Sequence, residues 1–178
     1  PDGRQVYEEG INIPIMPLAL GGDMNRMVLD IIAHNVRNPV EVEGDLYSLV
    51  ACNAVGSKRL VSMMDEFGLA SIDGLADHII EASRKGMAAE IAKLPNGVYK
   101  NAMRVDGYES ALDLVAEMTI SDDTISVCFK GTSPVSSYGI NVPITYTEAY
   151  ASFGVRCAVG NEIPNNAGSL AAVRITAP

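Results

Sequence analysis

The sequence predicts an α+β fold, in which a helical N-terminal half is followed by antiparallel hairpin strands and a further helix. Two observations predict it. Between residues 23 and 94, apolar residues recur at the three-and-four spacing of amphipathic helices. Between residues 112 and 129 they recur at every second position, which is typical of strands with one buried face. We therefore expect an extended strap plus three helices in residues 1–95. Residues 96–178 are expected to form a β-hairpin region with one helix, packed as part of a larger domain.

The strap and the first helix come first along the chain. Residues 11–18 alternate apolar residues with prolines, and such a pattern favours extended backbone over helix. Asp23 precedes a run of apolar residues at helical spacing, so we expect it to cap a helix that ends near Asn38-Pro39.

Two longer helices should follow. Residues 42–67 place apolar side chains along one side of a helix, and Gly68 is the expected C-terminal stop. A third helix is expected from about Ser71 or Asp73 to Leu94, where Pro95-Asn96-Gly97 ends it.

The second half of the chain is predicted to contain strands. Residues 112–121 and 125–129 both alternate, and Asp122-Asp123 between them predicts a hairpin turn. Residues 98–105 are expected to add a third strand and residues 171–176 a last short one. Residues 146–159 are rich in alanine and aromatic residues and predict a buried helix.

Composition excludes several functional classes. The 178 residues include 13 basic and 22 acidic ones, giving a net charge of -9, and the basic residues are scattered, so nucleic acid is not an expected partner. No run approaches the roughly 18 consecutive apolar residues of a membrane helix. We expect a cytoplasmic protein and, because the sequence starts at Pro1 without an initiator Met and stops within an expected strand, an interior piece of a longer chain.

Few residues suggest chemistry by themselves. Two histidines, His34 and His78, are too few for a His-rich metal cluster. The three cysteines are far apart and predict buried small hydrophobes rather than a disulfide framework or zinc site. The string Gly131-Thr132-Ser133-Pro134 follows a strand and offers a hydroxyl and amides, but it equally suits a turn. The residues alone therefore predict a fold class but do not identify a reaction.

Short strings in a fixed order run along nearly the whole chain. They are Tyr7-Glu8-Glu9-Gly10, Ile13-Pro14, Gly21-Gly22, Asn35-Val36-Arg37 with Pro39, Gly44-Asp45-Leu46, Arg59, Phe67-Gly68, Leu94-Pro95-Asn96-Gly97-Val98-Tyr99, Phe129-Lys130-Gly131-Thr132-Ser133-Pro134, Asn141-Val142-Pro143 and Ile163-Pro164-Asn165-Asn166-Ala167-Gly168. Each string is weak, but the ordered set resembles the hydantoinase B/oxoprolinase family. Val135 departs from the pattern, because the family often has Gln there.

The resemblance implies a subunit of an ATP-dependent cyclic-amide hydrolase that works with a hydantoinase A-type partner. ATP and Mg²⁺ would be bound through that partner, and the family's metal ligands would lie outside this piece. The candidates for approaching a substrate or a subunit surface are Arg37, Asp45, Ser133 and Asn141, although each could instead fix a turn or a helix end. We expect the piece alone to be catalytically incomplete.

Two alternatives stay open. The resemblance also extends to ATP-dependent ketone carboxylases, which likewise activate a carbonyl oxygen with ATP. A non-catalytic assembly module, whose apolar faces dock on another subunit, is compatible with a hydrophobic content of 48%.

Overall fold

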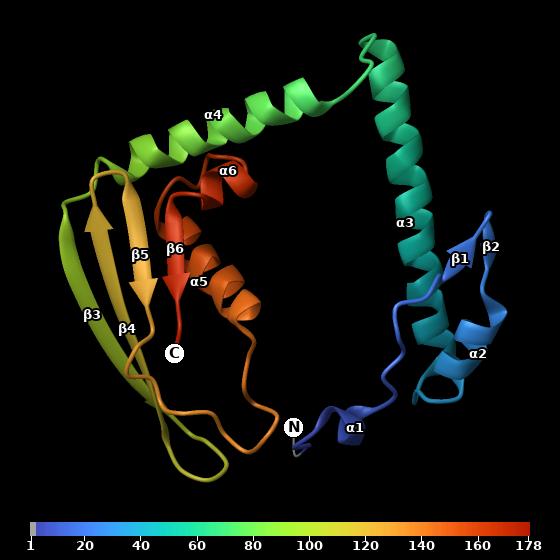
Figure 1. The fold of residues 1–178 in the computed structure, drawn as a ribbon, viewed down its shortest axis with the longest axis horizontal. Helices are drawn as coiled ribbons and strands as arrows, with labels where there is room; N and C mark the ends of the chain where they lie inside the picture. The colour runs from blue at the N-terminus through green and yellow to red at the C-terminus, as the bar shows by residue number, and fades with distance from the viewer. Residues whose placement is uncertain (1–2) are drawn as a thin grey trace. The chain divides into compact units, whose positions relative to one another are not determined.

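The computed structural model describes residues 3–178, and they form two compact units, Gly3–Ile72 and Asp73–Pro178. Figure 1 shows the order of the elements along the chain. The predicted α+β class is confirmed, because helices dominate the first half, and a sheet and a further helix follow.

The first unit begins with the strap and a small strand pair. Its elements before the long helix are α1 (Val6–Glu9), β1 (Ala19–Leu20), β2 (Asp23–Met24) and α2 (Arg26–Ala33). Gly21 and Gly22 have positive φ and reverse the chain, so that Asp23 pairs with Leu20 in an antiparallel ladder. Asp23 is therefore a strand residue, and the expected helix cap at this position is wrong. The N-cap of α2 is Asn25, whose backbone N–H donates to the Leu18 carbonyl at 2.8 Å.

The long helix α3 (Pro39–Glu66) ends as the sequence predicts. Gly68 has φ +61°, its N–H donates to the Asp65 carbonyl, and the Leu69 N–H donates to the Met64 carbonyl at 2.8 Å. This pair of bonds is a Schellman motif, which satisfies carbonyls at the helix end that would otherwise lack donors. Within the described part of the chain, no residue of α3 is buried. The apolar side predicted for this helix is therefore present but largely uncovered; Leu49 is 61% exposed.

The second unit is built around a four-stranded sheet of order β3-β4-β5-β6. The strands are β3 (Gly97–Val105), β4 (Leu112–Ser121), β5 (Thr124–Cys128) and β6 (Val173–Thr176). The predicted hairpin is confirmed: β4 and β5 are antiparallel with Ser121 opposite Thr124, and Asp122 occupies the turn at φ +52°. The strand β6 lies parallel to β5, with Val173 opposite Ile125.

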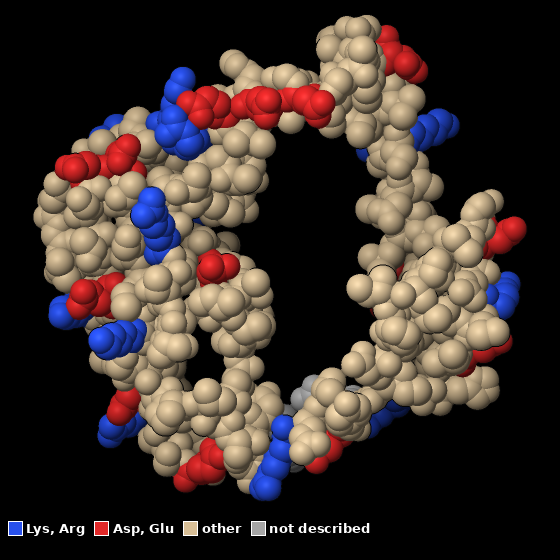
Figure 2. Space-filling view, in the orientation of Figure 1, with Lys and Arg blue, Asp and Glu red and all other residues tan. Residues whose placement is uncertain are grey.

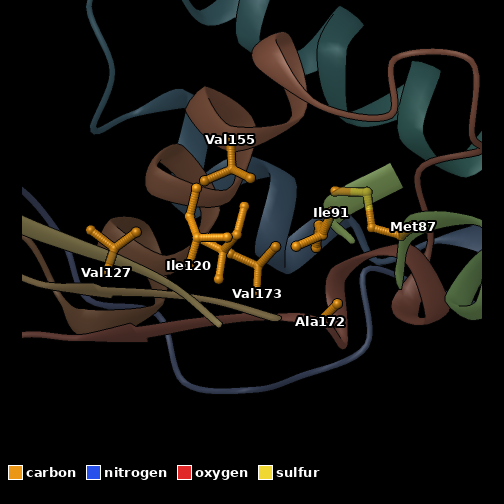
Figure 3. Close-up of a cluster of buried hydrophobic side chains, with 8 residues drawn as sticks. Met87, Ile91, Ile120, Val127, Val155, Ala172 and Val173 are labelled. Atoms are coloured by element: carbon orange, nitrogen blue, oxygen red, sulfur yellow. The ribbon is translucent and has the colours of Figure 1, made fainter. Parts of the chain in front are cut away.

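Three helices complete this unit: α4 (Asp73–Ile91), α5 (Ile144–Ala158) and α6 (Ala167–Leu170). Met87 and Ile91 of α4 are fully buried against the sheet and its covering helix (Figure 3). The other members of the core are Ile120, Ile125, Val127, Val155, Ala172 and Val173. Helix α4 thus belongs with the sheet by its contacts, whereas the sequence groups it with residues 1–95. A domain boundary near residue 95 in the whole protein stays a prediction.

Helix α6 docks closely on α4. The Asn166 side chain caps α6 by accepting from the Gly168 and Ser169 N–H groups, and its amide donates to the buried Ser83 hydroxyl on α4 at 2.8 Å. Gly168 lies so close to the Ile80 carbonyl that an added Cβ would be 1.9 Å from its oxygen. Within the string 163–168, Asn166 and Gly168 therefore join α6 to α4.

Some burial predictions are wrong. Helix α5 exists as expected, but only Ser152 and Val155 are buried on it, and Phe153 is 65% exposed. Cys52 and Cys157 are exposed rather than buried, because each lies on a helix face that no described element covers. No helix among the described residues is long and apolar enough to cross a membrane. Figure 2 shows Lys and Arg interspersed with Asp and Glu on the face in view.

Candidate functional site

The connection from β5 to α5, residues 129–143, carries two of the four predicted site residues, Ser133 and Asn141. It begins where β5 leaves the sheet and ends at Pro143, the N-cap of α5. The structure therefore brings these two residues onto one loop, although each makes its own set of contacts.

Hydroxyl groups fasten the start of this loop to β4. The Ser133 N–H donates to the Asp113 carbonyl at 2.8 Å, and the Ser133 Oγ accepts from the Asp113 N–H at 2.9 Å. The Thr132 Oγ1 accepts from the Val115 N–H at 3.0 Å and donates to the Val115 carbonyl at 3.2 Å. These bonds replace the ladder that β5 would have made had it continued beside β4.

The hydroxyls of Thr132 and Ser133 differ in whether they can still donate a hydrogen bond. Thr132 uses its proton on the Val115 carbonyl. Ser133 accepts one bond through its hydroxyl oxygen, and within the described part of the chain its hydroxyl donates no hydrogen bond. A serine hydroxyl is one donor and two acceptors, so Ser133 is held in place by β4 while keeping a donor for a ligand.

Asn141 closes the second part of the loop. Its Oδ1 accepts from the Ser136 N–H at 2.9 Å, and its Nδ2 donates to the Ser136 carbonyl at 2.7 Å and the Tyr138 carbonyl at 3.1 Å. Both amide protons are thus used within the loop. This geometry favours the turn-fixing role that the sequence left open for Asn141.

Glu109 is a residue of this site that sequence reasoning missed. It lies in the β3–β4 hairpin loop, and its carboxylate accepts from the Ser136 Oγ at 2.8 Å, the Ser137 N–H at 3.0 Å and the Ser137 hydroxyl. The Ser137 hydroxyl, followed by the Ser136 hydroxyl, lowers the pKa of Glu109 from 4.5 to about 2. Beside it, the Tyr108 and Tyr138 rings stack with centroids 4.8 Å apart. A carboxylate and a ring pair therefore join the two loops.

No sequence signal identifies this junction. Glu109 is separated by 27 and 28 positions from the two serines that it binds. An acidic residue in a hairpin loop and a serine pair in another loop are each ordinary, and periodicity does not place them together.

The other two predicted residues lie in the unit Gly3–Ile72. Arg37 is exposed in the connection between α2 and α3, and Asp45 is exposed on α3. Among the described residues, no group of three His, Cys, Asp or Glu side chains could hold a metal ion.

A groove of about 940 Å³ runs between α5 and β6 within the unit Asp73–Pro178. One face of α5 forms its first wall, with Ala149, Phe153 and Cys157 at helical spacing, and β6 contributes Val173 and Ile175. Arg156 also lines it, but its guanidinium is committed to the Gly160 and Ile163 carbonyls. The groove is thus a mixed surface whose apolar residues come from both walls.

Comparisons with known proteins give a consistent result. The family model described as Hydantoinase B/oxoprolinase matches residues 1–178. A protein of Pseudomonas sp. (strain NS671), described as the B-type component of a D-/L-hydantoinase, is 29% identical over 99% of this chain and 32% of its own length. The beta chain of the caprolactamase of Pseudomonas jessenii is 24% identical over 79% of this chain and 25% of its own.

A solved structure has the same fold. The crystal structure of the ATP-dependent caprolactamase from Pseudomonas jessenii superposes with a TM-score of 0.83 at 23% identity, covering 99% of this chain and 31% of that chain. The chain therefore spans about a third of the length of these two proteins that it matches over nearly its whole extent.

Proposed function

The chain belongs to the hydantoinase B/oxoprolinase family, and we propose that it forms part of a subunit of an ATP-dependent cyclic-amide hydrolase. The observation that carries this proposal is the match over residues 1–178 together with the names of the relatives. These are a hydantoinase component, a caprolactamase component and a 5-oxoprolinase of Saccharomyces cerevisiae, and each name refers to a ring that contains an amide.

The chemistry explains why ATP would be required. Resonance makes an amide carbonyl carbon a weak electrophile. Transfer of the γ-phosphoryl group of ATP to the carbonyl oxygen makes the carbonyl carbon a stronger electrophile, and water then adds to that carbon. The ring C–N bond breaks as the nitrogen takes up a proton and leaves, and a second water hydrolyses the resulting acyl phosphate to a carboxylate and phosphate. We propose that a hydantoinase A-type partner binds ATP and Mg²⁺ and transfers the phosphoryl group, and that any divalent metal is bound outside this segment.

Ser133 is the strongest of the four candidates for contact with substrate. Its lone pair is engaged by the Asp113 N–H, which fixes the oxygen, and its proton remains able to donate to an anionic oxygen. For Asn141 we propose loop closure, with Arg37 and Asp45 kept as candidates for a substrate or subunit surface because both are exposed.

The test measures ATP consumption by the polypeptide expressed from its own gene, mixed with its hydantoinase A-type partner, against cyclic amides and small ketones. Turnover of a cyclic amide without bicarbonate supports the hydrolase. Bicarbonate-dependent turnover of a ketone would instead identify the carboxylase alternative, and silence across the panel would contradict both.

Variants then test the role of Ser133. We expect Ser133→Ala to lower kcat/KM by about tenfold or more, the usual loss of a hydrogen bond made in the transition state. Ser133→Thr should restore most of the activity, and Ser126→Ala, on an exposed position of β5, should have no effect. Equal activity of Ser133→Ala and the natural protein would remove Ser133 from the site.

One observation favours the assembly module as a second candidate. None of the 28 residues of α3 is buried by the described chain, so a long helix is left with apolar side chains to cover. This candidate predicts that the polypeptide forms a stable complex with its partner but gives no turnover on any substrate in the panel.

A further inference from the structure

We propose that the groove between α5 and β6 receives an extended strand, which pairs with the free edge of β6 and becomes the fifth strand of the sheet. The strand would come from the part of a family-length polypeptide outside the matched segment. The proposal concerns how the unit is completed and does not depend on the reaction.

The first argument is the open edge of the sheet. In the strand order β3-β4-β5-β6, β6 is the last strand and has β5 as its single strand neighbour among the described residues (Figure 1). The Ile125 N–H donates to the Ala172 carbonyl and the Phe129 N–H donates to the Thr176 carbonyl, both at 2.9 Å. In a parallel ladder alternate residues face the neighbour, so Val173 and Ile175 direct their N–H and C=O groups toward the opposite edge.

The second argument is the wall that stands beside this edge. Thr145, Glu148, Ala149, Ser152, Phe153, Arg156 and Cys157 recur at three-and-four spacing, so a single face of α5 lines the groove. Phe153 is 65% exposed on that face. An exposed strand edge beside an uncovered aromatic side chain is a site where another strand can pair. Natural proteins usually protect such an edge with charged side chains or a covering segment.

The size of the groove fits a short strand. The strand β6 has four residues, and a paired segment of that length extends about 13 Å. Strand addition obtains its affinity from main-chain hydrogen bonds and its specificity from alternate side chains, and here those side chains would meet Ala149, Phe153 and Cys157.

The relatives supply the argument for the occupant. This chain spans 32% of the hydantoinase relative and 31% of the caprolactamase chain, so two thirds of a family-length polypeptide lies outside the matched segment. A strand from that polypeptide is present at a high effective concentration, whereas a second copy would have to associate from solution.

The test is amide hydrogen exchange, resolved by residue, in the polypeptide expressed from its own gene. We expect the Val173 and Ile175 amides to exchange on the order of 100-fold slower than exposed amides, and to match the Arg174 and Thr176 amides that face β5. This protection should be independent of protein concentration. Rapid exchange at Val173 and Ile175 beside a protected Arg174 would overturn the proposal.

A proline variant gives a second measurement. Proline is tolerated at a strand position whose N–H group faces solvent. Where that N–H group is bonded to a neighbouring strand, proline removes the hydrogen bond. We therefore expect Ile175→Pro to speed exchange at Val173 by at least about tenfold while leaving the Arg174 amide protected. An unchanged Val173 rate would contradict strand pairing. Protection that disappears on dilution, with a dimer mass before dilution, would replace the proposed occupant with a second copy.

Discussion

Gly168→Ala should destabilise the unit Asp73–Pro178 because α6 has no space for a methyl group at its contact with α4. The added Cβ would lie 1.9 Å from the Ile80 oxygen, 2.8 Å from the Ile80 carbonyl carbon and 3.1 Å from the Arg84 nitrogen. All three atoms belong to backbone within a helix, so no flexible side chain can move aside. The helices must separate instead.

The magnitude follows from this geometry. Adding atoms to a tightly packed contact lowers the free energy of unfolding by about 1–3 kcal/mol. Because the clash at Gly168 is with helix backbone and is this short, we expect a loss at or above the upper end of that range. Separating the helices would also weaken the bond from Asn166 to the buried Ser83. We expect a loss of about 3 kcal/mol in the free energy of unfolding, which lowers Tm by roughly 6–12 °C for a protein of this size.

Urea and thermal unfolding of the variant provide the assay. Gly154→Ala is the matched control, because it makes the same change within α5, where nothing lies within 4 Å of an added Cβ. That control should gain about 0.5–1 kcal/mol from the lower entropy of the unfolded chain and better helix propensity. A Gly168→Ala variant with an unfolding midpoint equal to that of the natural protein would refute the close contact between α6 and α4.

Three further predictions concern a cap, a helix end and a carboxylate. Asn166→Ala should lower the free energy of unfolding, measured in urea, by about 1–2 kcal/mol, because it removes the cap of α6 and the bond to the buried Ser83 hydroxyl. The control Asn165→Ala changes an exposed residue one position earlier and should lower it little. Equal losses in the two variants would contradict the capping role. Gly68→Ala should lower the free energy of unfolding by about 1 kcal/mol, because Gly68 has a φ of +61° that alanine adopts only with strain. The control Gly56→Ala, within α3, should raise the free energy of unfolding. A stabilising Gly68→Ala would argue against the Schellman motif at the end of α3. Because the folded pKa of Glu109 is depressed, its loop junction should persist above pH 4.5 and be lost as pH falls through about 2; an NMR titration midpoint near 4.5 would exclude the junction.

Where the fold could be predicted, the signal was local. The hairpin of β4 and β5 was predicted because the alternation is long and Asp122-Asp123 interrupts it at the turn. The end of α3 was predicted because glycine suits the left-handed position after a helix. Both signals lie within a few residues of the structure they specify.

Where prediction failed, the determinant was distant or short. The strands β1 and β2 have two residues each and carry no periodicity, so Asp23 was assigned to a helix cap. The four-residue α6 is specified by its contact with α4, about 80 positions earlier. The exposure of α5 and of Cys157 could not be read from composition, because an alanine-rich helix is compatible with either environment.

The candidate site was only partly accessible from the sequence. Ser133 and Asn141 were identified because the ordered strings resemble a family, and the structure adds that one keeps a free hydroxyl proton while the other uses its amide within the loop. Glu109 could not be identified from the sequence, because the two loops that it joins are brought together only by the pairing of β3, β4 and β5.

The parallel pairing of β5 with β6 also has a consequence for the order of folding. Ile125 pairs with Val173 across 48 positions of chain, whereas the turn between β4 and β5 brings Ser121 and Thr124 together almost at once. Closing the longer loop costs more chain entropy, so the hairpin should form early and β6 should join late. Since Ala172 and Val173 belong to the core, that late step completes the packing around Ile125. Mutations in β6 should therefore accelerate unfolding more than they slow folding.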